Sequence, residues 1–127
     1  MNPATKRRPG PWPLWVVALA AATLLAEIGI SAEVVDPRTM WPLDEKTLIE
    51  SVKKTSRAIV LDEGYERYGV TAELASVIAA GAFYNLDAPV KRMGAMHVPI
   101  PFSPPLEDVT VPTEQTVFEA ARVLCGR

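Results

Sequence analysis

Residues 57–64 read Arg-Ala-Ile-Val-Leu-Asp-Glu-Gly, and they carry the clearest structural signal in the chain. The apolar run 58–61 is short and unbroken, and it ends at two acidic residues and a glycine. Such a run is typical of a central parallel strand that is covered on both faces. The segment therefore predicts a sheet that lies between two layers of other structure.

Helical patterns lie on both sides of this strand. Residues 15–28 are rich in Ala and Leu, which are strong helix formers, and Gly29 follows where a C-terminal cap belongs. Asp44, Thr71 and Thr113 each stand at the N-cap position of a further helix with an apolar stripe. The sequence thus predicts four helices.

Two more strands are expected at residues 31–35 and 89–93, and residues 95–112 carry five prolines and no helical periodicity. Helices that alternate with strands at this spacing imply right-handed crossovers. The predicted fold class is α/β: a three-layer sandwich with a mostly parallel sheet and flanking helices.

The composition limits the class of protein. A chain of 127 residues fits one domain, which we place at residues 14–127 after a basic, proline-rich segment at 1–13. The formal net charge of −2 gives no sign of a nucleic-acid partner. The single cysteine, Cys125, excludes an internal disulfide and is expected to act as a small hydrophobic residue.

The N-terminal region has two interpretations. Residues 6–8 are basic and precede the apolar run 14–26, which is the order found in a signal peptide. The run is shorter than the roughly 20 residues of a membrane-spanning helix, and residues 30–32 form a poor cleavage site. We favour a helix buried in the domain of a cytoplasmic protein; export through residues 1–26 is the alternative.

Residues for catalysis are sparse. The chain has no glycine-rich phosphate loop, no CxxC or HExxH spacing and no Gly-x-Ser-x-Gly elbow. His97, the only histidine, lies in an irregular segment, where a proton carrier and an ordinary loop histidine are both conceivable. We predict no catalytic, cofactor-binding or metal-binding residue in this chain.

A candidate interface follows the central strand. Asp62 and Glu63 come at its expected carboxyl end, where sites of α/β sheets gather, although a capping or solvated pair is the simpler interpretation. Tyr65, Arg67 and Tyr68 follow in the same loop. Aromatic residues and arginine are enriched in interfaces, and a plain solvated loop is the alternative.

Several stretches together resemble one family. Residues 36–44 (Asp-Pro-Arg-Thr-Met-Trp-Pro-Leu-Asp) resemble the D-x-R-T-x-x-P-x-D segment of the transketolase C-terminal domain, and residues 51–55 and 60–64 look like its next helix and strand. Residues 86–90 and 98–107 are similar to the beta subunits of pyruvate and acetoin dehydrogenases. The resemblance implies a C-terminal domain, or a split or truncated form, of a 2-oxoacid dehydrogenase beta subunit.

The same resemblance implies which partners and cofactors to expect. Thiamine diphosphate and magnesium belong to the parent complex and are held by regions absent from this chain, so the isolated chain is expected to be inactive. Family members use the domain for homodimer or heteromer assembly with thiamine-binding subunits, and for docking to the peripheral subunit-binding domain of an acyltransferase. The docking residues carried over are Asp87 and the C-terminal carboxylate of Arg127.

Three points stay open. Asp87 is also explained as a turn residue before Pro89. The family's domain opens with a strand that residues 1–13 do not supply, which would expose a sheet edge or leave a gap. An independent homodimeric interaction module is the alternative function, with an exported or membrane-tethered protein as a third.

Overall fold

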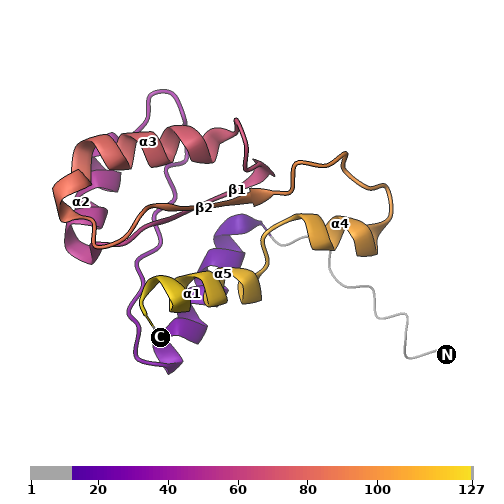
Figure 1. The fold of residues 1–127 in the computed structure, drawn as a ribbon, viewed down its shortest axis with the longest axis horizontal. Helices are drawn as coiled ribbons and strands as arrows, with labels where there is room; N and C mark the ends of the chain where they lie inside the picture. Colours follow the sequence, from indigo (N-terminus) through magenta and orange to yellow (C-terminus); the bar gives the residue numbers. More distant parts are fainter. Residues whose placement is uncertain (1–12, 127) are drawn as a thin grey trace.

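The computed structural model describes residues 13–126, and it has three layers (Figure 1). Helices α2 and α3 cover one face of a small parallel sheet, and α1 and α5 lie against the other. The predicted α/β sandwich is confirmed. In chain order the elements are α1 (Leu14–Glu27), α2 (Glu45–Thr55), β1 (Ile59–Tyr65), α3 (Val70–Ala82), the 3-10 turn η2 (Phe83–Asn85), β2 (Lys91–Ala95), α4 (Pro104–Thr110) and α5 (Glu114–Leu124).

The ends of three helices lie where the sequence predicts them. Asp44 caps α2, because its carboxylate accepts hydrogen bonds from the backbone N–H and the hydroxyl of Thr47 at 3.1 and 2.7 Å. Thr113 caps α5 in a reciprocal box with Thr116. Gly29 follows α1 with φ of 80°, a left-handed conformation that glycine adopts without strain.

Helix α1 packs on α5 rather than standing alone. Ala21 and Leu25 are buried, whereas Trp15 and Leu19 on other faces are about half exposed. No helix among residues 13–126 combines the length and the hydropathy that a membrane span requires. The proposed leader, residues 1–26, lies partly outside the described residues, which begin at Pro13.

The sheet within residues 13–126 has two strands, and β1 pairs with β2 in parallel. Ile59 lies opposite Lys91 and Leu61 opposite Met93, and the register shifts between Leu61 and Tyr65. The central core lies on one face of this sheet, between it and α2 and α3. Its buried members are Leu48, Val52, Val60, Leu74, Ile78 and Ala82.

The structure corrects three predictions about local structure. Residues 31–35 run extended but form no ladder with β1, so the predicted strand is unpaired. Helix α3 begins at Val70 with Gly69 as its N-cap, not at Thr71. The prediction that residues 95–112 hold no helix is also wrong, because Pro104 and Pro105 occupy the first turn of α4, where a missing N–H costs nothing.

The two predicted strands that form the sheet, β1 and β2, are both displaced toward the C-terminus. The apolar run starts at Ala58, yet β1 continues past it through Asp62 to Tyr65. Strand β2 begins at Lys91, two residues after Pro89, and ends at Ala95. The acidic pair 62–63 therefore lies inside a strand, at the irregular part between Leu61 and Tyr65 where the register with β2 shifts.

Candidate functional site

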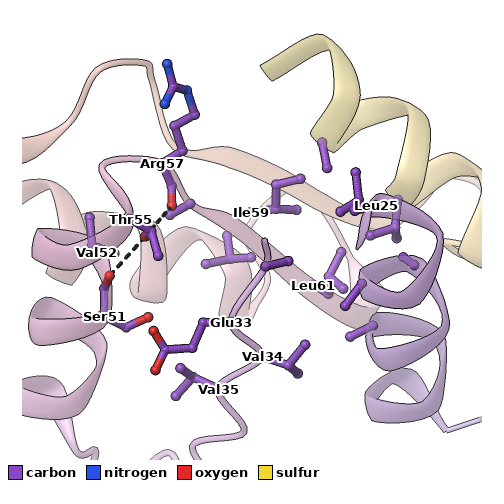
Figure 2. Close-up of a pocket in the computed structure, with 18 of the residues that line it drawn as sticks. Leu25, Glu33, Val34, Val35, Ser51, Val52, Thr55, Arg57, Ile59 and Leu61 are labelled. Carbon is purple, nitrogen blue, oxygen red and sulfur yellow. Dashed lines mark hydrogen bonds between the residues drawn. The ribbon is translucent and has the colours of Figure 1, made fainter. Parts of the chain in front are cut away.

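A cleft of about 600 Å³ separates β1 from the layer formed by α1 and α5. Figure 2 shows Ile59 and Leu61 of β1, Leu25 of α1 and the extended segment with Val34 around this space. One side of the cleft is therefore a strand, and another is the chain that connects α1 to α2. A cavity of this size is in the range of small-molecule sites, but few of its side chains are polar.

The lining of the cleft is mainly aliphatic. Its charged members are Glu33, Asp36 and Arg57. Glu33 forms an ion pair with Lys54 of α2 at 3.1 Å, which ties the extended segment to that helix. The Arg57 side chain donates from Nε to the backbone carbonyl of Leu124 at 3.1 Å and so joins the end of α5 to the start of β1. Both charged side chains are thus held by neighbouring elements, and most of the other lining side chains are apolar.

The chemistry of this lining does not fit thiamine diphosphate and magnesium. A diphosphate needs several cationic or N–H donors, and Arg57 is the one cation among the lining residues. No group of three or more His, Cys, Asp or Glu side chains that could hold a metal occurs within residues 13–126. We therefore assign no step of thiamine chemistry to these residues.

Asp87, the predicted docking residue, lies on the surface just after η2. Its side chain is 61 % exposed, and one carboxylate oxygen is 3.6 Å from the Arg57 guanidinium. Its backbone N–H donates to the carbonyl of Ser56 at 2.9 Å, which fixes the loop against the end of α2. The carboxylate is accessible and only loosely paired. Arg127, the other predicted docking residue, lies outside the described residues.

Two exposed aromatic side chains precede Asp87, and neither was among the predicted site residues. Phe83 and Tyr84 are exposed by 66 and 98 %, and their rings meet edge to face with centroids 5.4 Å apart. The signal in the sequence was their position: both follow Ala82, the last residue of the apolar stripe of α3, so neither continues that stripe into the core. We call Phe83, Tyr84 and Asp87 the acidic-aromatic patch.

The other predicted interface residues do not form one cluster. Asp62 is half-buried within β1 and Glu63 is exposed, and neighbours in a strand point to opposite faces. Tyr65 ends the strand and meets His97 edge to face, with ring centroids 5.3 Å apart. Arg67 and Tyr68 are exposed in the turn, and Tyr68 has φ of 59°.

The turn after β1 is held by its backbone. The Glu66 carbonyl accepts from the Arg92 guanidinium at 3.2 Å and from the Thr71 hydroxyl at 3.5 Å, and Thr71 is fully buried. At Gly94 an added Cβ would lie 2.7 Å from the Gly64 carbonyl oxygen, so the two strands approach too closely there for a side chain. The turn is therefore rigidly placed, with Tyr68 directed into solvent.

A third exposed surface follows β2. Apolar side chains are exposed along the segment 96–109, which leads from the sheet into α4. Large exposed apolar patches mark interaction sites, so this segment is a candidate for one. The exposed apolar residues of this segment, which we call the β2–α4 surface, are Met96, Val98, Ile100, Phe102, Leu106 and Val109.

Comparison with known proteins gives one family. The model of the family described as "Transketolase, C-terminal domain" matches residues 14–117. The chain is 45 % identical over 109 residues to the acetoin:2,6-dichlorophenolindophenol oxidoreductase subunit beta of Bacillus subtilis, and the match covers 86 % of this chain and 32 % of that protein.

Two further relatives carry the same kind of name. The pyruvate dehydrogenase E1 component subunit beta of Rickettsia felis is 44 % identical over 109 residues, with 86 % of this chain and 33 % of the relative covered. The mitochondrial subunit beta-1 of the same component from Oryza sativa is 42 % identical over 110 residues, with 87 and 29 % covered. The chain thus spans about a third of the length of the curated relatives it matches.

Proposed function

This chain belongs to the transketolase C-terminal domain family, and we propose that it is the assembly and docking domain of a 2-oxoacid dehydrogenase beta subunit. The observation that carries the proposal is the identity of 42–45 % with beta subunits over most of the chain. Subunits so named act within complexes of several chains. Thiamine diphosphate and magnesium are cofactors of the proposed complex, bound outside the residues described above.

The acidic-aromatic patch supports a docking role. Aromatic side chains are enriched at binding hot spots, and the exposed carboxylate three residues after Tyr84 can accept charge-assisted hydrogen bonds from a basic partner. Asp87 meets this requirement because its oxygen atoms are accessible and its ion pair with Arg57, at 3.6 Å, is long. We propose the peripheral subunit-binding domain of an acyltransferase as the docking partner, with the carboxylate of Arg127 as a second acceptor.

Calorimetry with such a subunit-binding domain at low ionic strength tests the docking role. We expect Asp87→Asn to weaken binding about ten- to hundredfold, since a hydrogen bond to a charged group contributes about 1.5–3 kcal/mol. The matched control is Glu50→Gln on α2, which removes one negative charge from a side chain that is equally exposed, at 63 %. Binding that is absent, or equally weakened in both variants, would contradict the docking role.

A second function is favoured by the β2–α4 surface. Six exposed apolar side chains on one segment suit a homodimer that works as an independent interaction module. Light scattering after size exclusion distinguishes the two functions. We expect Phe102→Ser to convert a dimer into a monomer if the module acts alone, whereas a docking domain would bind the acyltransferase domain with or without this change.

The cellular location follows from the function and is likewise a proposal. An assembly domain of such a complex is expected in the cytoplasm, with export through residues 1–26 as the alternative. Sequencing the N-terminus of the native protein tests both, because a chain that begins at Met1 or Asn2 has not been cleaved.

A further inference from the structure

We infer that the cleft between β1 and the segment 30–36 is an empty strand position, which accepts an uncharged, extended segment of about six residues from another polypeptide. This inference deepens the proposed assembly role, because it names the kind of partner segment that the domain takes up. It rests on the unpaired edge of β1, on the shape and polarity of the cleft, and on the residues that precede α1.

The backbone of β1 has one unpaired edge, which follows from the register of the ladder. The Ala58 carbonyl accepts from the N–H of Lys91 at 3.0 Å, and Val60 lies opposite Arg92. In a parallel ladder alternate residues bond to the same neighbour, so Ala58 and Val60 direct their backbone groups to β2. The N–H and C=O groups of Ile59 and Leu61 therefore point the other way, toward the segment 30–36.

This free edge begins at Ile59. The carbonyl of Arg57, which has the same direction, already accepts from the Thr55 hydroxyl at 3.1 Å (Figure 2). Within residues 13–126 no second strand pairs with β1, so the backbone groups of Ile59 and Leu61 have no ladder partner. A strand edge that lies in an apolar cleft lacks the devices that usually protect an edge, such as charged side chains or proline.

The segment 30–36 forms the opposite wall and lies as a strand would. Val34 and Val35 both border the cleft, and Val35 also packs against the core under α2 and α3. Figure 2 shows the two side chains pointing in different directions, as neighbours in a strand do. The ion pair between Glu33 and Lys54 holds the segment in place, at 3.1 Å. An extended segment that alternates in this way, yet has no ladder partner, indicates room for one strand between it and β1.

The two helical layers determine the chemistry of the missing strand. Leu74 and Ile78 of α3 line one side of the cleft, and Ala21, Leu25 and Val117 of α1 and α5 line the other. A strand covered on both faces must be apolar on both, as β-branched runs in parallel sheets are. A charged side chain in the middle of this segment would find no free partner, because the three charged lining residues already have ion-pair partners.

The chain's own leading residues do not have this chemistry. Residues 1–13 contain four prolines, which lack the N–H that a ladder needs, and three consecutive basic residues at 6–8. The chain also spans only about a third of the length of the relatives it matches, so we expect the segment that completes the sheet among the other two-thirds of such a subunit. Addition of a strand to a sheet edge is an established mode of peptide recognition.

A synthetic peptide tests the inference on the full chain. The probe is Lys-Lys-Val-Ile-Val-Ile-Val-Thr-Lys-Lys, whose six central residues form an uncharged strand with soluble ends. Its matched control has proline at the second and fourth central positions, which removes two backbone donors and keeps the charge. We expect saturable binding of the first peptide by calorimetry and at least tenfold weaker binding of the second. No binding at millimolar peptide would overturn the inference.

Amide hydrogen exchange then locates the bound peptide. We expect at least tenfold slower exchange at Ile59 and Leu61, and no change at Val60, whose N–H is already directed to β2. The thiol of Cys125 also lines the cleft, so its reaction with a thiol reagent should slow in the bound state. Protection at other amides, with Ile59 and Leu61 unaffected, would overturn the inference.

A pair of variants provides the control for specificity. Ala22 lines the cleft, and Ala22→Phe should fill the strand position and weaken peptide binding at least tenfold. Ala79→Phe makes the same change on the exposed face of α3 and should leave binding unchanged. Light scattering and hydrogen exchange without peptide provide a further check. If the chain is a dimer whose Ile59 and Leu61 amides are already protected, the occupant is a second copy and the inference of a different polypeptide is wrong.

The docking proposal and this inference can fail separately. Asp87→Asn should leave peptide binding unchanged, because Asp87 is not among the residues that line the cleft. Peptide binding without acyltransferase binding would reject the docking role alone, and the reverse result would reject the strand position alone.

Discussion

The two faces of the sheet differ in how completely this chain covers them. On the α2–α3 face six side chains form one buried cluster, with Ile78 exposed by only 3 %. On the α1–α5 face three residues are buried, and the cleft of about 600 Å³ lies beside them. Residues of both helical layers line the cleft, but only α2 and α3 also meet in a closed cluster beside it. The domain is thus well packed on one face of the sheet and more open on the other.

The largest effect should come from the closed face. We expect Ile78→Ala to lower the free energy of unfolding by about 3 kcal/mol, because a buried large-to-small change loses transfer energy and leaves a cavity that neighbours cannot fill. Denaturant unfolding measures this loss. The control, Ser76→Ala, lies on the exposed side of the same helix and should change little. A loss below about 1 kcal/mol would mean that the α2–α3 face is packed no more tightly than the α1–α5 face.

The same kind of change on the open face should cost less. Leu25 is as buried as Ile78, at 4 %, and both side chains line the cleft, but Leu25 does not belong to the six-residue cluster. We expect Leu25→Ala to cost about 2 kcal/mol, since a side chain outside that cluster has fewer neighbouring atoms to lose contact with. The strand peptide should enlarge both costs, because it would pack against both side chains. If Leu25→Ala and Ile78→Ala lower the free energy of unfolding equally without peptide, the two faces of the sheet do not differ in packing.

The smallest effect should come from the cap of α2. Hydrogen bonds from the hydroxyl and the backbone N–H of Thr47 hold the pKa of Asp44 below its ordinary value of 3.8. Because the folded-state pKa is lowered, the carboxylate stabilises the fold above the unfolded pKa, and this contribution is lost as the pH falls through the folded pKa. Thermal unfolding should show Asp44→Ala as slightly destabilised at neutral pH, with the difference shrinking below about pH 3.8.

Asp44→Asn separates the cap from its charge. The amide oxygen can still accept from the Thr47 N–H, but it does not titrate in this range, so this variant should lack the pH-dependent part of the loss. A difference between wild type and Asp44→Ala that stays constant down to pH 2 would show that the carboxylate charge adds nothing to the cap.

Local signals were predicted well, and contacts between distant segments were not. The caps at Asp44 and Thr113 and the glycine after α1 depend on neighbours within four residues, so the sequence indicated them directly. The prediction that Thr71 caps α3 was wrong. Gly69 occupies the N-cap position, where an added Cβ would collide with the Tyr65 carbonyl oxygen. The contact of Tyr65 with His97 joins positions 32 residues apart, and no local pattern encodes it.

The sequence by itself determined the fold class, the order of most elements and the family, because periodicity, caps and short motifs are properties of neighbouring residues. Only the tertiary structure decided that residues 31–35 remain unpaired, that Asp87 stays accessible beside Arg57, and that a cleft lies along β1. Those features depend on how the sheet and the two helical layers pack against one another. A strand that the chain does not contain cannot be recognised from its residues. Its position is indicated only in the fold, by the unpaired edge of β1 and the apolar cleft beside it.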